Sequence, residues 1–214
     1  MLSQNAKLVL AGGFIRDCIA NEPINDIDVF TGSKEGARQI ASDLAAAKGW
    51  QRLETDNAFT VLGGQWPVQF IHRWSFDAPA KCVESFDFTI ARAAVWFGDL
   101  KDDDRHTILS STCDDRFYCD LAAKRLVYCC PERNEDAGGS MLRVLKFYQR
   151  GYRIPLDSLG AVMARMAKDY NEVAYPDGMT REQHMAFVFT GMLREVDPNV
   201  DPEHLMHLPA IGAV

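Results

Sequence analysis

The sequence predicts an α+β fold, a mixed β-sheet backed by helices and followed by a short helical extension. Three observations support this class. Short apolar runs rich in β-branched and aromatic residues alternate with turn residues over the first half of the chain. An alanine-rich segment with helical spacing lies among them. The second half carries helical patterns interrupted by prolines. We therefore expect a head domain over residues 1–135 and a helical extension over residues 136–214.

The bulk composition agrees with a folded protein of this size. Of the 214 residues, 47% are hydrophobic, which is enough for one globular unit or for a compact domain with an extension. The net charge of −7 argues against an extended nucleic-acid surface but leaves room for a local basic face. The sequence shows no run of eighteen apolar residues and no export signal, so we expect a cytoplasmic protein with no membrane partner. Its six cysteines form no C-x-x-C pair and are expected to be reduced.

The first elements are a short strand and a helix that meet at a pair of glycines. The strand is expected at Leu8–Leu10, the pair is Gly12 and Gly13, and the helix is expected at Phe14–Ala20. Because glycine has no Cβ, the backbone can approach a ligand there, and the N–H groups at a helix start favour a phosphate. Arg16 would supply a fixed cation. The glycine turn is thus a candidate phosphate-binding site.

A pair of carboxylates accompanies the next predicted strand. Asp26 and Asp28 flank Ile27 in a run of strand formers that ends at Phe30. Alternate residues of a strand face the same side, so the two carboxylates can share a hard cation such as Mg²⁺ with phosphate oxygens. Two metals about 3.5–4 Å apart are an arrangement that phosphoryl transfer uses. A lone D-x-D pair is more often a solvated turn, but the nearby glycine turn favours the metal interpretation.

These residues resemble the DNA polymerase β-like nucleotidyltransferases, most closely the branch of bacterial poly(A) polymerases and CCA-adding enzymes. That branch carries G-G-x-x-R-D, a short helix and then D-x-D. This pattern is matched in identity and spacing by Gly12, Gly13, Arg16, Asp17, Asp26 and Asp28. The resemblance implies a minimal nucleotidyltransferase head that uses Mg²⁺ or Mn²⁺ and a nucleoside triphosphate such as ATP. It would transfer a nucleoside monophosphate to a hydroxyl of RNA or tRNA, of a protein or of a small molecule.

The remaining elements complete the sheet and the helical extension. In chain order we expect a helix at 33–49, a hairpin at 50–61, a strand at 67–72, a short helix at 77–84, a buried strand at 85–95, a strand at 107–111 and helices at 141–154, 157–170 and 180–194. The first of these helices has Ile40, Leu44 and Ala47 on one apolar stripe. Gly63 and Gly64 are expected to form a plain hairpin loop and not a second phosphate cradle.

The strand at 67–72 departs from the resembled family. There it normally brings a third carboxylate toward the D-x-D pair, whereas this sequence has Gln69. An amide can orient a metal-bound water, but it adds no charge and cannot act as a base. Three alternatives follow: an acid such as Asp77 or Glu54 substitutes, the enzyme is slow, or the protein is a non-catalytic nucleotide-binding sensor or interaction module.

Two further segments match the family in part. Asp87 occupies the acidic position of the family's R-D-F-T-I-N-A segment, which is associated with the nucleotide's sugar, or it is simply an acid at the start of a strand. Arg143, Lys146 and Arg150 recur at helical spacing, either as a positive face for a triphosphate or an RNA end or as a solvated face. The family's E-D-x-x-R element is incomplete after Glu135, so its choice of base is not carried over.

Overall fold

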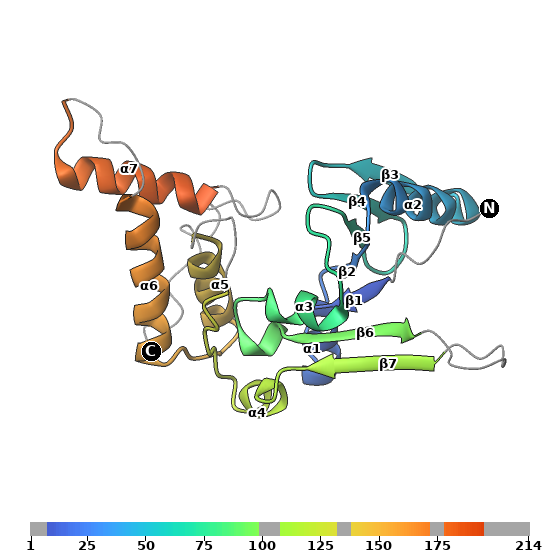
Figure 1. Cartoon of the computed structure of the whole chain (residues 1–214), viewed down its shortest axis with the longest axis horizontal. Coiled ribbons are helices and arrows are strands. Elements are labelled where there is room, and N and C mark those ends of the chain that lie inside the picture. Colours follow the sequence, from blue (N-terminus) through green and yellow to red (C-terminus); the bar gives the residue numbers. More distant parts are fainter. Residues whose placement is uncertain (1–7, 99–107, 132–137, 172–177, 195–214) are drawn as a thin grey trace, which may run out of the picture. The chain divides into compact units, whose positions relative to one another are not determined.

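The structure is a computed structural model of the chain, and it describes residues 8–98, 108–131, 138–171 and 178–194 (Figure 1). The chain forms two compact units, Met1–Ala123 and Lys124–Val214. The predicted α+β class is confirmed, because the described residues of the first unit form a seven-stranded mixed sheet backed by helices. The predicted domain boundary at residue 135 falls outside the described residues and stays a prediction.

The first unit alternates strands and helices along the chain. Its elements are β1 (Val9–Ala11), α1 (Gly13–Ala20), β2 (Ile27–Phe30), α2 (Lys34–Lys48), β3 (Gln51–Glu54), β4 (Ala58–Leu62), β5 (Val68–Ile71), α3 (Pro79–Glu84), the 3₁₀ helix η1 (Thr89–Ala91), β6 (Ala93–Gly98), β7 (Ile108–Cys113) and α4 (Phe117–Ala122). The strands are ordered β3-β4-β5-β2-β1-β6-β7 across the sheet. The pair β2 and β5 is parallel, and the other neighbouring pairs are antiparallel.

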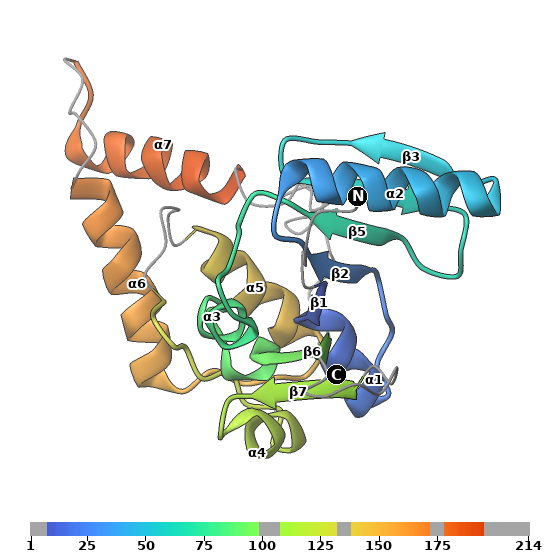
Figure 2. The ribbon, with the colours of Figure 1, turned by 45° about the vertical axis from the view of Figure 1, so that its right-hand side comes forward.

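Helix α2 lies along β3, β4 and β5 and covers one face of that part of the sheet (Figure 2). Its buried stripe is Ala37, Ala41 and Ala45, which pack with Phe59, Val61 and Phe70 in one cluster. Ile40 and Leu44 flank this stripe, as expected, but Ala47 is exposed, so its predicted place on the stripe is wrong. The reason is that three small alanines, four residues apart, let the helix approach the aromatic sheet surface closely.

The ends of α2 follow from its flanking residues. Ser33 Oγ accepts a hydrogen bond from the Gly36 N–H at 3.0 Å, which caps the first turn. Gly49 ends the helix with a left-handed φ of 67°, as the sequence predicted.

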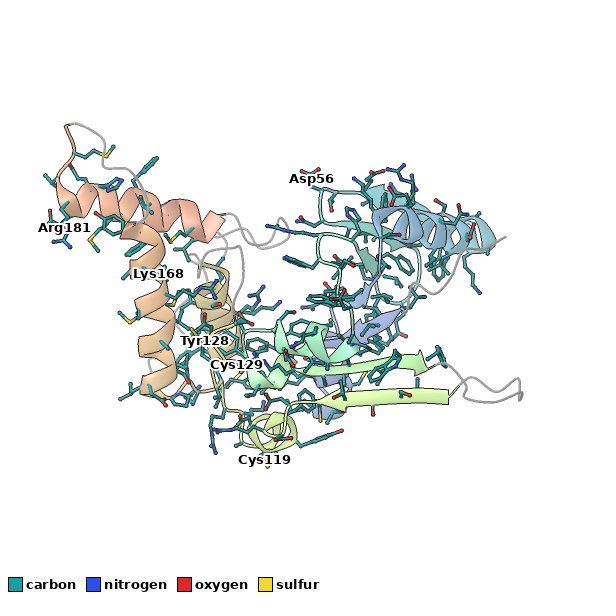
Figure 3. All side chains as sticks on the ribbon, viewed as in Figure 1. Asp56, Cys119, Tyr128, Cys129, Lys168 and Arg181 are labelled. Atoms are coloured by element: carbon teal, nitrogen blue, oxygen red, sulfur yellow. The ribbon has the colours of Figure 1, made fainter. Side chains whose placement is uncertain are left out.

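The glycines after β4 serve packing. An ideal Cβ on Gly63 or Gly64 would lie 2.5 or 2.9 Å from the indole ring of Trp50, and Gly63 has a φ of 136°. Glycine is therefore required for the hairpin between β4 and β5 to close over Trp50. The expectation of a plain hairpin loop is confirmed. The preceding β3–β4 turn carries the exposed Asp56 at its tip (Figure 3).

The predicted strand at 85–95 is wrong over most of its length. Strand β6 begins only at Ala93, and η1 precedes it. The cause is Arg92, whose Nε donates to the Phe86 carbonyl at 2.9 Å and whose Nη2 donates to the Glu84 carbonyl at 2.8 Å. These bonds hold the segment in a turn that a ladder strand could not adopt.

The second unit is helical and contains α5 (Gly138–Gln149), α6 (Leu156–Asn171) and α7 (Arg181–Arg194). Tyr128, labelled in Figure 3, is buried, and its backbone N–H donates to Ser158 Oγ at 3.2 Å. Tyr170 of α6 and the buried His184 of α7 have ring centroids 5.3 Å apart. Within the described ranges, no helix is long and apolar enough to cross a membrane.

Candidate active site

Three strands place polar side chains in a row on the face of the sheet opposite α2. Asp28 of β2 pairs with Gln69 of β5, and Gln69 pairs with Thr60 of β4. Residues paired across neighbouring strands point to the same face, so the three side chains share it. The next pair, Val29 and Phe70, belongs to the cluster under α2 on the other face. All three polar residues are half-buried.

Asp26 joins this row from the residue before β2. The Gln69 side-chain Nε2 donates to Asp26 Oδ2 at 3.0 Å. The two parallel strands also start side by side, because the Ile27 N–H donates to the Pro67 carbonyl at 2.9 Å. The structure therefore brings together Asp26, Asp28 and Gln69, which the sequence singled out.

The glycine turn reaches the same edge of the sheet. Strand β1 runs antiparallel to β2, with Val9 opposite Phe30. Continuing this register brings Gly12 opposite Ile27, the first residue of β2, and α1, which begins at Gly13, contacts β2. The end of β1, the start of α1 and the start of β2 thus meet at one place.

The two glycines differ in what they can offer a ligand. Gly12 has a left-handed φ of 81°, and a Cβ there would lie 3.1 Å from the Phe86 ring. Its N–H donates to the Ala93 carbonyl at 3.1 Å, so a phosphate near Gly12 would lie against its Cα, and the role of Gly12 in phosphate binding stays a prediction. Gly13 begins α1, and the first N–H groups of a helix lack acceptors within the helix. A phosphate would therefore be met by Gly13 and the rest of the first turn.

Arg16 lies beside the glycine turn as an ion pair and not as a lone cation. It is 7% exposed, and its Nε and Nη2 donate to Asp17 Oδ1 and Oδ2 at 2.8 and 3.0 Å. A Cβ on Gly13 would lie 3.2 Å from Arg16 Nη2. The guanidinium thus lies against the start of α1, and the carboxylate of Asp17 fixes its orientation and balances part of its charge.

The hypothesis that Glu54 supplies the third carboxylate is wrong. Its carboxylate lies 3.3 Å from Arg38 and 3.8 Å from Lys34, both on α2, so it serves the opposite face of the sheet. Asp77 is exposed in the loop before α3. Within the part of the chain that the structure describes, no group of three or more His, Cys, Asp and Glu side chains could hold a metal ion.

The oxygen atoms of Asp26, Asp28 and Gln69 nevertheless fit a hard cation as ligands. Asp26 and Asp28 offer carboxylate oxygens, and Gln69 has an amide oxygen beyond the nitrogen that bonds Asp26. Mg²⁺ takes oxygen ligands and is often bound by one or two carboxylates together with substrate phosphates. Two acids and an amide are therefore sufficient for one cation that arrives with a nucleotide.

The other predicted site residues have separate locations. Asp87 is 2% exposed, between α3 and η1. Arg143 and Lys146 are half-buried on α5 of the second unit. The guanidinium carbon of Arg150 lies 5.6 Å from the Phe147 ring centroid. The roles of Asp87, Arg143 and Lys146 in nucleotide binding stay predictions.

Sequence reasoning missed three residues at the site. Thr60 shares the polar row, and the hairpin register at 50–61 was the signal that could have identified it. Phe14 of α1 and Trp66 before β5 form an edge-to-face pair with ring centroids 5.9 Å apart. Their spacing in the sequence gives no indication of this contact.

Comparisons with known proteins found a matching family model and solved structures of similar fold. The family model described as Gabija anti-defense 2 family protein matches residues 1–124. Similar solved structures include a tRNA-processing enzyme with CTP (17% identity, 78% of this chain and 45% of that chain, TM-score 0.57). A tRNA nucleotidyltransferase with a primer tRNA and an ATP analogue is also similar (18% identity, 78% of this chain and 49% of that chain, TM-score 0.57). The Thermotoga maritima CCA-adding enzyme complexed with tRNA is similar as well (18% identity, 90% of this chain and 44% of that chain, TM-score 0.54).

These structures establish a nucleotidyltransferase-like fold and nothing finer, because the identities are low. The chain spans less than half the length of each of these three structures. A comparison with curated proteins found no match to the sequence.

Proposed function

The chain belongs to the Gabija anti-defense 2 family, and we propose that it acts as a metal-dependent nucleotidyltransferase. It would move a nucleoside monophosphate from a nucleoside triphosphate to a hydroxyl of an acceptor. The observation that carries the proposal is the meeting of the glycine turn with Asp26 and Asp28 at one edge of the sheet. The nucleotidyltransferase-like fold supports it.

The residues of the site have different roles, which follow from their charges. Asp26 and Asp28 would hold Mg²⁺ or Mn²⁺, which supplies charge neutralisation for the pyrophosphate that leaves. The first turn of α1, from Gly13, would donate N–H groups to the phosphates. Arg16, oriented by its bonds to Asp17, would add positive charge beside them.

Gln69 shapes how the acceptor loses its proton. An amide has no basic atom, so the proton of the attacking hydroxyl would pass to a carboxylate of the row or to solvent. Gln69 instead orients Asp26 through its bond to Oδ2. We therefore expect transfer to be slower than with a third carboxylate.

The description of the family, Gabija anti-defense 2, supports a setting in which this chemistry would act against Gabija defense. A transferase would act against Gabija defense by modifying an acceptor that this defense needs. The acceptor would be RNA or tRNA, a protein or a small molecule.

The deciding experiment supplies each nucleoside triphosphate, labelled on the α- or the γ-phosphate, to the pure protein. Mg²⁺ or Mn²⁺, small RNAs and an extract of cells that carry Gabija defense complete the mixture. We expect the α-label to enter an acceptor and the γ-label to leave as pyrophosphate, and chelation of the metal to prevent both. Absence of α-label from every macromolecule and small product would contradict the proposal.

An RNA acceptor has its own signature. Binding should weaken steeply with salt, and replacement of Arg143 or Lys146 by alanine should lower the slope of log affinity against log salt by about 1 each. Lys168→Ala, at an exposed position of α6 labelled in Figure 3, is the matched control and should leave the slope unchanged. Affinity that is flat with salt would move the acceptor toward a protein or a metabolite.

The second candidate is a nucleotide-binding sensor or interaction module without turnover. The observation that favours it is the amide of Gln69 in place of an acid, hydrogen-bonded to Asp26. Gln69→Glu separates the two functions. Wild-type protein that binds Mg²⁺-triphosphate without transfer, with a gain of transfer in the variant, would support the sensor. Transfer by the wild type would support the enzyme. A faster variant is then the result expected of a site that lacks a third carboxylate, and a slower variant would mean that another acid already fills this role.

A further inference from the structure

An aromatic pair lies beside the candidate site without a part in the roles given so far. Phe14 is the second residue of α1, and Trp66 precedes β5 by two positions. Their ring centroids are 5.9 Å apart with an interplanar angle of 71°, an edge-to-face contact. Both side chains are half-buried.

The backbone places this pair at the edge where the glycine turn meets the carboxylates. Phe14 directly follows Gly13, the first residue of α1, and α1 contacts β2, the strand that directly follows Asp26. Trp66 directly precedes Pro67, whose carbonyl accepts the Ile27 N–H at 2.9 Å. The two rings therefore connect the start of α1 to the start of β5 next to the predicted metal site.

The other three tryptophans have different surroundings within the described residues. The Trp50 ring fills the space over Gly63 and Gly64. Trp96 packs against the core cluster that contains Val9 and Phe30. The exposed Trp74 lies under Arg73, whose guanidinium carbon is 5.0 Å from the ring centroid.

We propose that Phe14 and Trp66 form a subsite on which a nucleobase stacks. In an edge-to-face pair, one ring meets the other with its edge, so its own faces are not consumed by the contact. Every base has a π-face, and stacking on an aromatic side chain tolerates any sequence. The base belongs either to the nucleoside triphosphate or to the end of a nucleic-acid acceptor. This inference rests on the proposed nucleotidyltransferase function.

The test measures affinity with two probes that differ by the base. ATP and inorganic triphosphate are titrated, each with Mg²⁺, into wild type, Trp66→Ala, Trp66→Phe and the control Trp74→Phe. We expect Trp66→Ala to lower the affinity for ATP by about 5- to 150-fold, the range that corresponds to base stacking on an aromatic ring. The affinity for inorganic triphosphate should stay unchanged. Trp66→Phe should restore most of the ATP affinity, because phenylalanine keeps a stacking face. Trp74→Phe should bind as wild type does.

A second arm distinguishes the source of the base. A short single-stranded RNA is titrated into the same proteins, and a loss in Trp66→Ala for RNA but not for ATP assigns the subsite to the acceptor. Equal losses for ATP and triphosphate, or unchanged affinities for ATP and RNA, would overturn the stacking subsite. RNA binding that depends on Trp66 while neither triphosphate probe binds would overturn the proposed function and keep the subsite. Absence of binding by all three probes would overturn both.

Discussion

The two faces of the sheet in the first unit are built on different principles. On the face under α2, Phe59 and Val61 are fully buried and Phe70 is 5% exposed. On the other face, Asp28 and Gln69 are half-buried and polar. The same face becomes apolar two residues further along β2 and β5, where Phe30 and Ile71 are paired and buried in another cluster.

This difference separates stability from chemistry. The face under α2 gains from every apolar group removed from water. The polar row instead keeps two carboxylates of like charge on neighbouring positions of one face, which costs stability unless a cation or a donor compensates. One donor is visible, the Gln69 amide on Asp26. Substitutions under α2 should therefore lower mainly the stability, and substitutions in the polar row should lower mainly the activity.

The largest expected effect is on stability, at the face under α2. Phe59→Ala should lower the free energy of unfolding by about 3–5 kcal/mol, because it removes a fully buried ring and leaves a cavity. Leu53→Ala on the adjacent strand is the control, since Leu53 is 42% exposed and faces the other side. Urea denaturation measures both. A loss for Leu53→Ala as large as that for Phe59→Ala would contradict the distinction between the faces.

The next effect is on activity, at the polar row. Asp28→Asn should reduce transfer by about 100-fold or more, because metal-bound charge stabilisation contributes several kcal/mol and each 1.4 kcal/mol is tenfold. Its unfolding midpoint should change little, because asparagine has nearly the size and shape of aspartate and the fold should stay intact. Transfer rate and urea midpoint are measured on the same preparation. Full transfer in Asp28→Asn would remove this residue from the metal site.

Much of this division could be predicted from the sequence where local patterns suffice. The glycine turn, the D-x-D pair and the long helix follow from spacing and turn residues within short segments. The α2 stripe was predicted only in part, because small alanines four residues apart are a weaker hydrophobic signal than the larger Ile40 and Leu44. The burial of three alanines depends on the aromatic residues of β4 and β5.

The rest required contacts between distant segments. That the Gly12 N–H is bonded depends on Ala93, some eighty residues later. That Glu54 serves α2 depends on the register of the β3–β4 hairpin, which sends Glu54 and Leu53 to opposite faces. The position of Gln69 beside Asp26 agrees with the place inferred from the family pattern, but its hydrogen bond is a side-chain detail that spacing does not encode.

The smallest effect concerns the hydrogen bond between Gln69 and Asp26. It measures how much stability the polar row loses when a further negative charge is added. In Gln69→Glu the donor at 3.0 Å from Asp26 is replaced by a carboxylate. Without metal, the lost hydrogen bond and the added repulsion should lower the free energy of unfolding by about 1–2 kcal/mol at neutral pH. Acidification should reverse part of this loss, because a proton on either carboxyl removes the repulsion. Gln69→Met is the control, since it removes the donor without adding charge, and its loss should depend little on pH.

Divalent cations should then separate the two variants. Mg²⁺ or Mn²⁺ that binds the folded state of Gln69→Glu more tightly than the wild type raises its unfolding midpoint more, by mass action. Gln69→Met gains no charge and should respond no more than the wild type does. Thermal unfolding of the three proteins over a metal titration measures this. An equal response in all three would mean that position 69 does not reach the cation, and the predicted metal ligands would then be Asp26 and Asp28 alone.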